Sequence, residues 1–253
     1  MALNISIWQG TLVENFYPDN SFASKSVDDS VFVKAHKVII PNAGKPSNVK
    51  KNRTAKPATV NTRTDNDLEY EIDELTTDPI YIPNIDTVEL SYDKRSSIIS
   101  NDRSQLQNEA HLNLLERWGA GVPAANVLLT TGTTERDAHT SETATGKRKR
   151  ITKDDLLAIM TRMDADNVPE EGRYILLDAY MYADLLADLS ESDKWMFQNS
   201  ADMQRGVLGN LYGLNIMKRS KVLRVKNDKT LLPWSEEAAA GELAAALAWH
   251  DKS

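Results

Sequence analysis

Residues 34–73 read KAHKVIIPNAGKPSNVKKNRTAKPATVNTRTDNDLEYEID, and the distribution of charge in and around this stretch decides how the chain is organised. Residues 34–63 carry eight basic side chains and no acidic one, whereas residues 65–93 carry ten acidic side chains and no basic one. A single charged run usually marks a solvated face. Two adjacent runs of opposite sign are harder to explain in that way, so we treat them as a candidate contact surface.

The two charged runs are predicted to lie on a long hairpin. Acidic side chains alternate with Asn66, Leu68, Tyr70 and Ile72 between residues 65 and 73, and a period of two predicts a strand with one acidic face. The β-branched segment Val31–Ile40 predicts a second strand. The residues between them are rich in Pro and Gly and hold almost no large apolar side chain, so they cannot bury a core of their own. We therefore expect a projecting arm that something outside its own subunit stabilises.

The remainder predicts a mixture of helices and strands. An amphipathic pattern predicts a long helix from Pro83 to Trp118, closed by Gly119 and Gly121. The Thr- and Gly-rich segment 119–150 predicts a loop whose last residues, Lys147 to Arg150, are exposed. The elements expected after it are a helix from N-cap Thr152 to about Asp164, a buried strand over 173–177, a helix over 178–189, two short strands around Gly213 within 206–220, and an Ala-rich helix over 238–249.

Composition excludes several classes of protein. The chain has 253 residues, a mass of 28.3 kDa, 41% hydrophobic and 26% charged residues, and no cysteine. Without cysteine there is no disulfide, thiolate metal site, iron–sulfur cluster or cysteine nucleophile. The net charge of −7 argues against a protein dedicated to coating duplex DNA. We expect neither a membrane-spanning segment nor a secretory signal, because no apolar run is long enough.

The sequence predicts no enzyme, no cofactor and no metal site. The four histidines are scattered, and no nucleophile motif or phosphate loop has the required spacing. Asp164 and Asp166 resemble the start of a calcium loop, but Val168 replaces an oxygen ligand and no glycine follows at the required position. The acidic strand itself lacks the turn geometry of a cation cage, so an electrostatic surface is the preferred interpretation.

The order of these segments resembles the major capsid proteins of tailed bacteriophages, the Hong Kong 97-type fold. Residues 36–64 look like the extended loop (E-loop) of that family. The residues Thr76-Thr77-Asp78-Pro79 and Ser91 to Ser96 are similar to the approach to its long spine helix. Arg173 to Leu177 with the helix after it, and above all Gly206 to Ser220 (GVLGNLYGLNIMKRS), are similar to its axial domain.

The resemblance implies an α+β capsid fold. Its expected parts are an N-terminal arm over 1–30, an E-loop hairpin over 31–75, a peripheral domain with the spine helix over 76–150, and a mixed α/β axial domain over 151–253. The family adds closing strands beside the spine helix. Because the chain here is expected to stop on or just after a helix, we expect those strands to be absent.

The implied function is a major capsid protein that self-assembles, as hexamers and pentamers, into an icosahedral shell enclosing packaged double-stranded DNA. Scaffold, portal or cement proteins are further partners that the family has. The expected location is the virion, after synthesis in the host cytoplasm.

Two other functions stay open at this level. One is an encapsulin-like nanocompartment shell around cargo enzymes, and the other is a nucleic-acid-binding module that uses the basic segment 34–63. Ten residues of the two charged runs are the candidate contact residues between subunits. They are Lys45, Lys50, Lys51, Arg53, Lys56, Asp65, Asp67, Glu69, Glu71 and Asp73.

Overall fold

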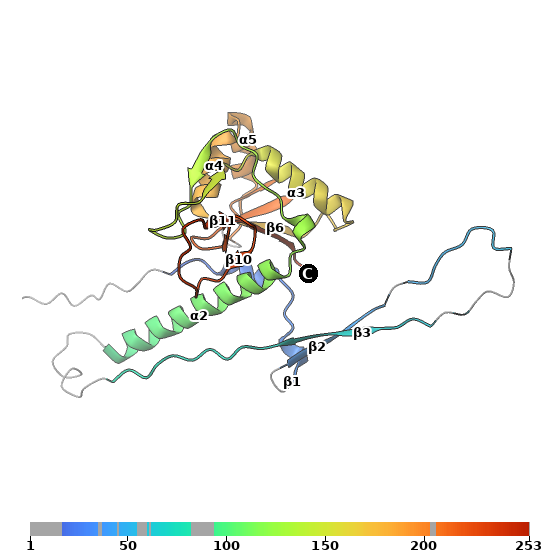
Figure 1. Ribbon diagram of the computed structural model, residues 1–253, viewed down its shortest axis with the longest axis horizontal. Helices are drawn as coiled ribbons and strands as arrows, with labels where there is room; N and C mark the ends of the chain where they lie inside the picture. The colour runs from blue at the N-terminus through green and yellow to red at the C-terminus, as the bar shows by residue number, and fades with distance from the viewer. Residues whose placement is uncertain are drawn as a thin grey trace, which may run out of the picture. The chain divides into compact units, whose positions relative to one another are not determined.

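The structure, a computed structural model, describes residues 17–34, 37–44, 46–54, 60, 62–81, 94–202 and 206–252. The chain divides into two compact units (Figure 1). Residues 28–76 form the smaller unit, and the rest of the chain forms the larger one.

The smaller unit is a three-stranded antiparallel sheet with the order β1-β2-β3. Its elements are the short helix η2 (Ser30–Phe32), β1 (Val33–Lys34), β2 (Lys37–Asn42) and β3 (Asn66–Glu71). The pairing of β2 with β3 runs from Lys37 opposite Glu71 to Asn42 opposite Asn66. The predicted acidic strand is confirmed as β3. The single strand predicted over Val31–Ile40 is instead divided into η2, β1 and β2, because β1 folds back to pair with β2. A turn at Lys51 and Asn52 lies in the segment between β2 and β3.

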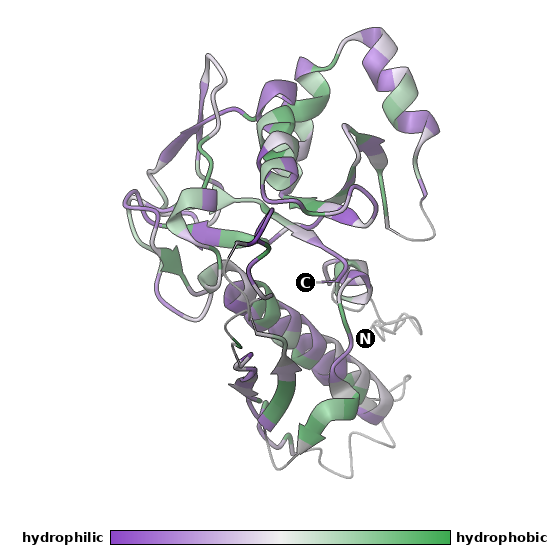
Figure 2. Ribbon diagram, turned by 90° about the vertical axis from the view of Figure 1, so that its right-hand side faces the viewer, coloured by the Kyte–Doolittle hydropathy of each residue, from purple (hydrophilic) through white to green (hydrophobic). Residues whose placement is uncertain are grey.

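A mixed four-stranded sheet lies at the centre of the larger unit, in the order β12-β6-β8-β7. Its strands are β6 (Arg173–Leu177), β7 (Gly209–Leu211), β8 (Leu214–Lys218) and β12 (Leu247–His250). Three helices accompany this sheet: α3 (Lys153–Ala165), α4 (Ala179–Asp188) and α5 (Glu191–Asn199). Ile175 and Leu177 of β6, Leu214 and Ile216 of β8 and Leu185 of α4 are fully buried in one core. Figure 2 shows green, apolar stretches alternating with purple, hydrophilic ones along the helices and strands.

Beside the long helix α2 (Lys94–Ala120) lies a second sheet, with the order β10-β9-β11. Its strands are β9 (Leu223–Val225), β10 (Leu231–Leu232) and β11 (Leu243–Ala245). An ideal Cβ on Gly119 would lie 2.9 Å from Leu223 Cδ1, so the end of α2 approaches β9 too closely for a larger residue to fit without a shift. The remaining elements are η1 (Ser21–Lys25), η3 (Ala124–Asn126), β4 (Glu135–Asp137) and β5 (Lys147–Lys149).

Local sequence signals account for several of these elements. The Thr152 side chain accepts from the Asp155 amide while Asp155 caps the Thr152 amide, a reciprocal capping box that begins α3 where it was predicted. The predicted strand at 173–177 and the predicted helix after it are confirmed as β6 and α4. The two short strands predicted around Gly213 are β7 and β8, and Gly213 has a φ of +77°, a conformation that glycine adopts without strain.

The predicted helix over 238–249 is wrong, because the segment forms β11 and β12 instead. Helix propensity favoured the alanines, but β11 completes a ladder on β9 and β12 completes one on β6. Tertiary pairing therefore overrides local preference. In the larger unit β9 and β10 contact α2, and β11 pairs with β9. The expected absence of the family's closing strands stays a prediction.

Two further expectations need correction. The segment 119–150 is not only loop, because β4 and β5 form a hairpin within it. The run Lys147 to Arg150 is not an exposed loop either, since Arg148 is buried. The long helix begins at Lys94 in the structure, and residues 82–93, which held its predicted start, lie outside the described residues.

Residues 17–27 also differ from a free arm. Phe22 of η1 is only 1% exposed and lies edge-on to Trp118 of α2 and Trp249 of β12. The Trp249 indole N–H donates to the Lys25 carbonyl, 2.8 Å away. This part of the predicted N-terminal arm therefore packs into the core of the larger unit, whereas residues 1–16 lie outside the described residues. The boundaries predicted at 30, 75 and 150 stay predictions.

Candidate assembly surfaces

The acidic face of β3 is paired in part with basic residues of its own hairpin. Asp67, Glu69 and Glu71 share one face of β3, and Lys37 of β2 lies opposite Glu71. Lys37 Nζ lies 2.5 Å from Glu69 Oε1 and 3.7 Å from Glu71 Oε1. The hydrogen bond to Glu69 raises the pKa of the exposed Lys37 ammonium. Two of the candidate acids thus have a partner within the chain.

Asp65 has its own partner just before β3. Arg63 Nε donates to Asp65 Oδ1 at 2.6 Å, and Arg63 Nη2 donates to Asp65 Oδ2 at 2.8 Å. The Gly44 amide donates to the same carboxylate from the other leg of the hairpin, at 2.7 Å. These bonds, led by the one from Arg63, lower the pKa of the Asp65 carboxyl. Asp65 therefore ties the two legs together beyond the last paired residues of the ladder.

The basic tip of the hairpin, unlike the acidic face of β3, forms no ion pair among the described residues. Lys50, Lys51 and Arg53 are exposed around the turn, where Asn52 adopts a φ of +51°. None of the described carboxylates pairs with these three basic side chains. No described basic side chain pairs with Asp67. Asp73 is exposed and follows the end of β3. Lys45 and Lys56 lie outside the described residues. The sequence hypothesis of a contact between subunits stays a prediction for all ten positions.

A buried ion-pair cluster in the larger unit was missed by sequence reasoning. The Asp184 side chain of α4 is fully buried, and Arg136 of β4 donates to it through Nε at 2.9 Å and Nη2 at 2.5 Å. Arg148 Nη2 of β5 lies 3.3 Å away and Arg150 Nε 3.7 Å away. The hydrogen bond to Asp184 raises the pKa of the Arg136 guanidinium. The period of two of a strand could have indicated this cluster, because in Lys147–Lys149 it buries the side chain of Arg148 and leaves those of Lys147 and Lys149 exposed.

A second buried pair holds the loop between β4 and β5. Glu242 is fully buried, and its carboxylate lies 3.1 Å from Arg224 Nη1 of β9. Thr140 donates to the same carboxylate at 2.5 Å, and the Ala239 amide donates at 3.1 Å. Glu242 thus joins the 139–146 loop to the strands beside α2, which gives the unit a polar bridge inside its apolar packing.

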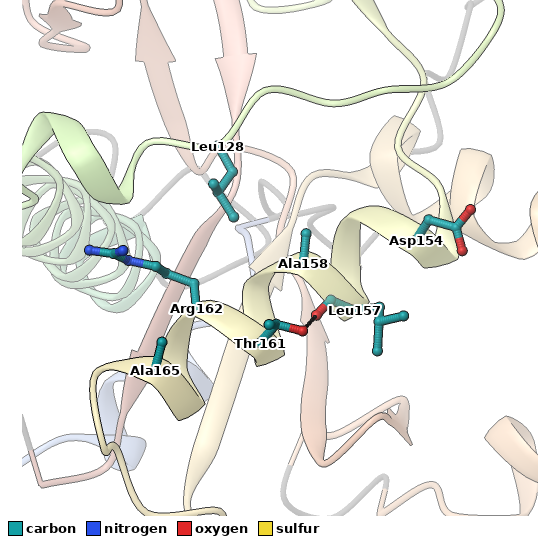
Figure 3. A pocket seen from close by; sticks show the side chains of 7 residues that line it. All are labelled: Leu128, Asp154, Leu157, Ala158, Thr161, Arg162 and Ala165. Carbon is teal, nitrogen blue, oxygen red and sulfur yellow. Dashed lines mark hydrogen bonds between the residues drawn. The ribbon is translucent and has the colours of Figure 1, made fainter.

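The outer side of α3 carries a shallow groove (Figure 3). Leu128, from the segment after η3, faces the helix across it, and Leu157, Ala158, Thr161 and Ala165 line the helix side. Asp154 and Arg162 stand at its ends, eight residues apart on α3. Leu128 and Leu157 remain 44% and 39% exposed, so the groove presents apolar surface without a partner among the described residues.

Two tests for other kinds of site apply to the described part of the chain. Within it, no cluster of three or more His, Asp or Glu side chains is placed to hold a metal ion. No helix there combines the length and the apolar character needed to cross a membrane.

Comparison with known proteins places the fold. No family model matches the sequence, and no curated protein sequence gives a significant match. Solved structures do match. The capsid structure of the cyanophage P-SCSP1u aligns with a TM-score of 0.60 and 16% identity over 99% of this chain and 78% of that one. The capsid of Ralstonia phage GP4 aligns with a TM-score of 0.59 and 13% identity over 99% and 80%.

The mature capsid of bacteriophage PhiM1 gives a TM-score of 0.56 at 13% identity, over 99% of this chain and 78% of that chain. The class that this fold defines is therefore the α+β fold of phage capsid proteins. The resemblance inferred from Gly206 to Ser220 and from the hairpin is confirmed at the level of fold.

Proposed function

We propose that this chain is a major capsid protein that self-assembles into an icosahedral shell enclosing packaged double-stranded DNA. The observation that carries the proposal is the alignment of 99% of the chain with solved phage capsid structures. The role is structural and not enzymatic, and hexamers and pentamers of the chain build the shell. Scaffold, portal or cement proteins are its further partners, and the virion is its location after synthesis in the host cytoplasm.

The composition of the smaller unit supports assembly. Among the side chains of 28–76 whose burial the structure describes, Val38 is the one buried hydrophobic side chain, whereas Val49 and Val60 are 98% and 93% exposed. A hairpin of this kind is marginal by itself, because two or three strands need a covered apolar face to be stable in water. Neighbouring copies in a shell supply that cover.

The charges of the hairpin suggest where it docks. On the face around β3, Lys37 pairs with Glu69 and Glu71, and Arg63 pairs with Asp65, so with Asp67 four acids stand against two bases and the face stays acidic. The tip with Lys50, Lys51 and Arg53 is basic and exposed. We therefore place the tip of one copy against the acidic face of a neighbour, with Asp67 as the acid most open to it. A single exposed pair contributes only about 0.2–1 kcal/mol, but a shell repeats the contact and complementary patches set its register.

Negative-stain microscopy and light scattering of the expressed chain test the function. Shells, rings or capsomer-sized oligomers at micromolar concentration are the expected result. A homogeneous 28 kDa species under all conditions would overturn the proposal. Shells that retain a host enzyme as cargo would indicate the nanocompartment instead. A monomer that binds duplex DNA with a steep dependence on salt would indicate the nucleic-acid-binding module.

Charge reversal tests the docking of the hairpin. The triple variant Lys50→Glu, Lys51→Glu and Arg53→Glu should lose assembly while its circular dichroism stays unchanged. Adding Asp67→Lys to that variant should restore part of the assembly. The matched control reverses Lys226, Lys229 and Lys252, exposed positions of the larger unit, and should assemble normally. If the combined variant assembles no better than the triple one, the two blocks are not partners.

A further inference from the structure

Helix α5 exposes two large apolar side chains that its own unit cannot cover. Trp195 and Met196 are 70% and 65% exposed. The helix cannot rotate to hide them, because Phe197 is buried in the core and a capping box between Ser190 and Asp193 fixes the first turn. Exposed Trp side chains of this kind are typical of the centres of protein–protein contacts. The exposed stripe of α5 runs through Glu191, Trp195, Met196 and Asn199.

The groove on α3 offers a matching concave surface. The small side chains of Ala158 and Thr161 line the middle of its helix side, across from Leu128, and Ala165 follows at the end of α3 (Figure 3). We expect these small side chains to admit a large ring. Its two ends carry opposite charges, Asp154 in the first turn of α3 and Arg162 in the last.

From these two surfaces we infer that α5 of one copy lies antiparallel in the α3 groove of the next copy, with Trp195 against Ala158. Four residues of helix rise about 6 Å, so this register places Glu191 opposite Arg162 and Asn199 opposite Asp154. Two residues of the facing helices lie opposite each other when their residue numbers have the same sum as 195 and 158. The register can therefore be tested at each such pair of positions. The inference rests on the proposed function, since it requires a second copy in an assembly.

Charge decides the direction of the helix. The Glu191 side chain is 95% exposed, and its partner Lys194 is at 3.3 Å. In the antiparallel arrangement Glu191 approaches the guanidinium of Arg162, and the two helix dipoles oppose each other. This guanidinium is 43% exposed, lies 3.3 Å from Asp166 and donates to Asn126 at 2.9 Å, so Glu191 would add a second carboxylate to it. In the parallel arrangement with the same central contact, Glu191 would face Asp154 instead. That like-charge pair disfavours the parallel direction.

The helix that fills the α3 groove comes from a second copy of this chain, because the exposed stripe of α5 and the α3 groove are complementary in shape and charge. The two surfaces are also different from each other. A contact between unlike patches is heterologous, and it generates closed rings when the rotation between copies closes. Rings of copies are what the proposed hexamers and pentamers require. If the same surface were used on both copies, the contact would be isologous and the assembly would end at a dimer.

Cysteine crosslinking tests the register, and the wild-type chain contributes no background because it has no cysteine. The double variant Thr161→Cys and Ser192→Cys places two exposed positions opposite each other in the antiparallel register. On assembly and mild oxidation, a non-reducing gel should show a ladder that extends beyond the dimer. The matched control, Thr161→Cys with Gln198→Cys, pairs only in the parallel register and should stay monomeric on the gel.

A charge swap provides the second measurement. Glu191→Arg and Arg162→Glu should each slow assembly severalfold, and the two together should recover most of the wild-type rate. Intact wild-type shells with no Thr161–Ser192 ladder, or with a ladder from the Gln198 control, would overturn this contact and leave the proposed function standing. A wild-type chain that stays monomeric under all conditions would overturn the proposed function itself.

Discussion

Arg136 and Asp184 form a two-donor ion pair in which the Asp184 side chain is fully buried and that of Arg136 is 22% exposed. The pair joins the β4–β5 hairpin to α4, and Arg148 completes it from the second strand of the hairpin. A guanidinium left in this site without its carboxylate would be a buried charge with no counter-ion, which is far more costly than a lost surface pair.

We therefore predict that Asp184→Asn lowers the free energy of unfolding by about 3 kcal/mol or more. Urea unfolding of the unassembled chain, followed by circular dichroism, measures the change. The matched control is Asp137→Asn, since Asp137 pairs with Lys147 at 3.7 Å on the exposed side of the same hairpin. The control should lose less than about 1 kcal/mol. Equal losses in the two variants would contradict the role given to Asp184.

Phe22 should behave as a core residue in spite of its position near the start of the chain. Phe22→Ala removes a ring that contacts Trp118, Trp249 and His111, and such truncations cost about 3–5 kcal/mol. The measurement is the thermal midpoint and the urea midpoint of the variant. Val27→Ala, at a position that is 51% exposed, is the control and should change either midpoint little. If Phe22→Ala left both midpoints unchanged, residues 17–27 would not belong to the core.

Glu242 should make stability depend on pH in the acidic range. Burial by itself would raise the pKa of Glu242, but hydrogen bonds led by the one from Thr140, with the charge of Arg224, bring it below the ordinary value of 4.5. A carboxyl whose pKa is lower in the folded than in the unfolded state contributes stability above the unfolded value. That contribution is lost as the pH falls through the folded value.

The wild type should therefore exceed Glu242→Gln in stability most clearly above pH 4.5, with the difference shrinking as the pH falls below it. Parallel urea titrations of both chains from neutral to acidic pH check this. A difference that stays constant across that range would mean that the Glu242 carboxylate is not the group responsible.

The hairpin tip should matter for assembly more than for folding. Replacing residues 43–64 by a short Gly-Ser linker keeps the β2–β3 ladder from Lys37 to Asn42, and it removes little buried apolar surface. The thermal midpoint should shift by only a few degrees, because loop closure costs little and no core is lost. Particle formation, followed by light scattering, should be abolished. Unfolding of the variant would show that the tip packs within its own unit.

The sequence predicted elements whose signals are local. The capping residues Thr152 and Asp155 marked the start of α3, and Gly213 marked the turn between β7 and β8. It failed where distant partners decide the structure. Ala244 and Ala248 favour a helix in isolation. In the structure Ala244 lies in β11, which pairs with β9, and Ala248 lies in β12, which pairs with β6.

The same limit explains why the contact surfaces were only partly predicted. The charged runs of the hairpin are visible in the sequence, yet the pairing of Lys37 with Glu69 depends on the register between β2 and β3. The groove depends on Leu128 lying across from α3, which no periodicity in either segment indicates.

The contact between Phe22 and Trp249 has a consequence for the order of events during synthesis. The aromatic cluster needs side chains separated by more than two hundred residues, so it cannot close until Trp249 has left the ribosome. Contacts of such long range also slow folding, because the ends of a long loop must meet first. A nascent chain therefore lacks this part of its core until the segment with Trp249 has emerged.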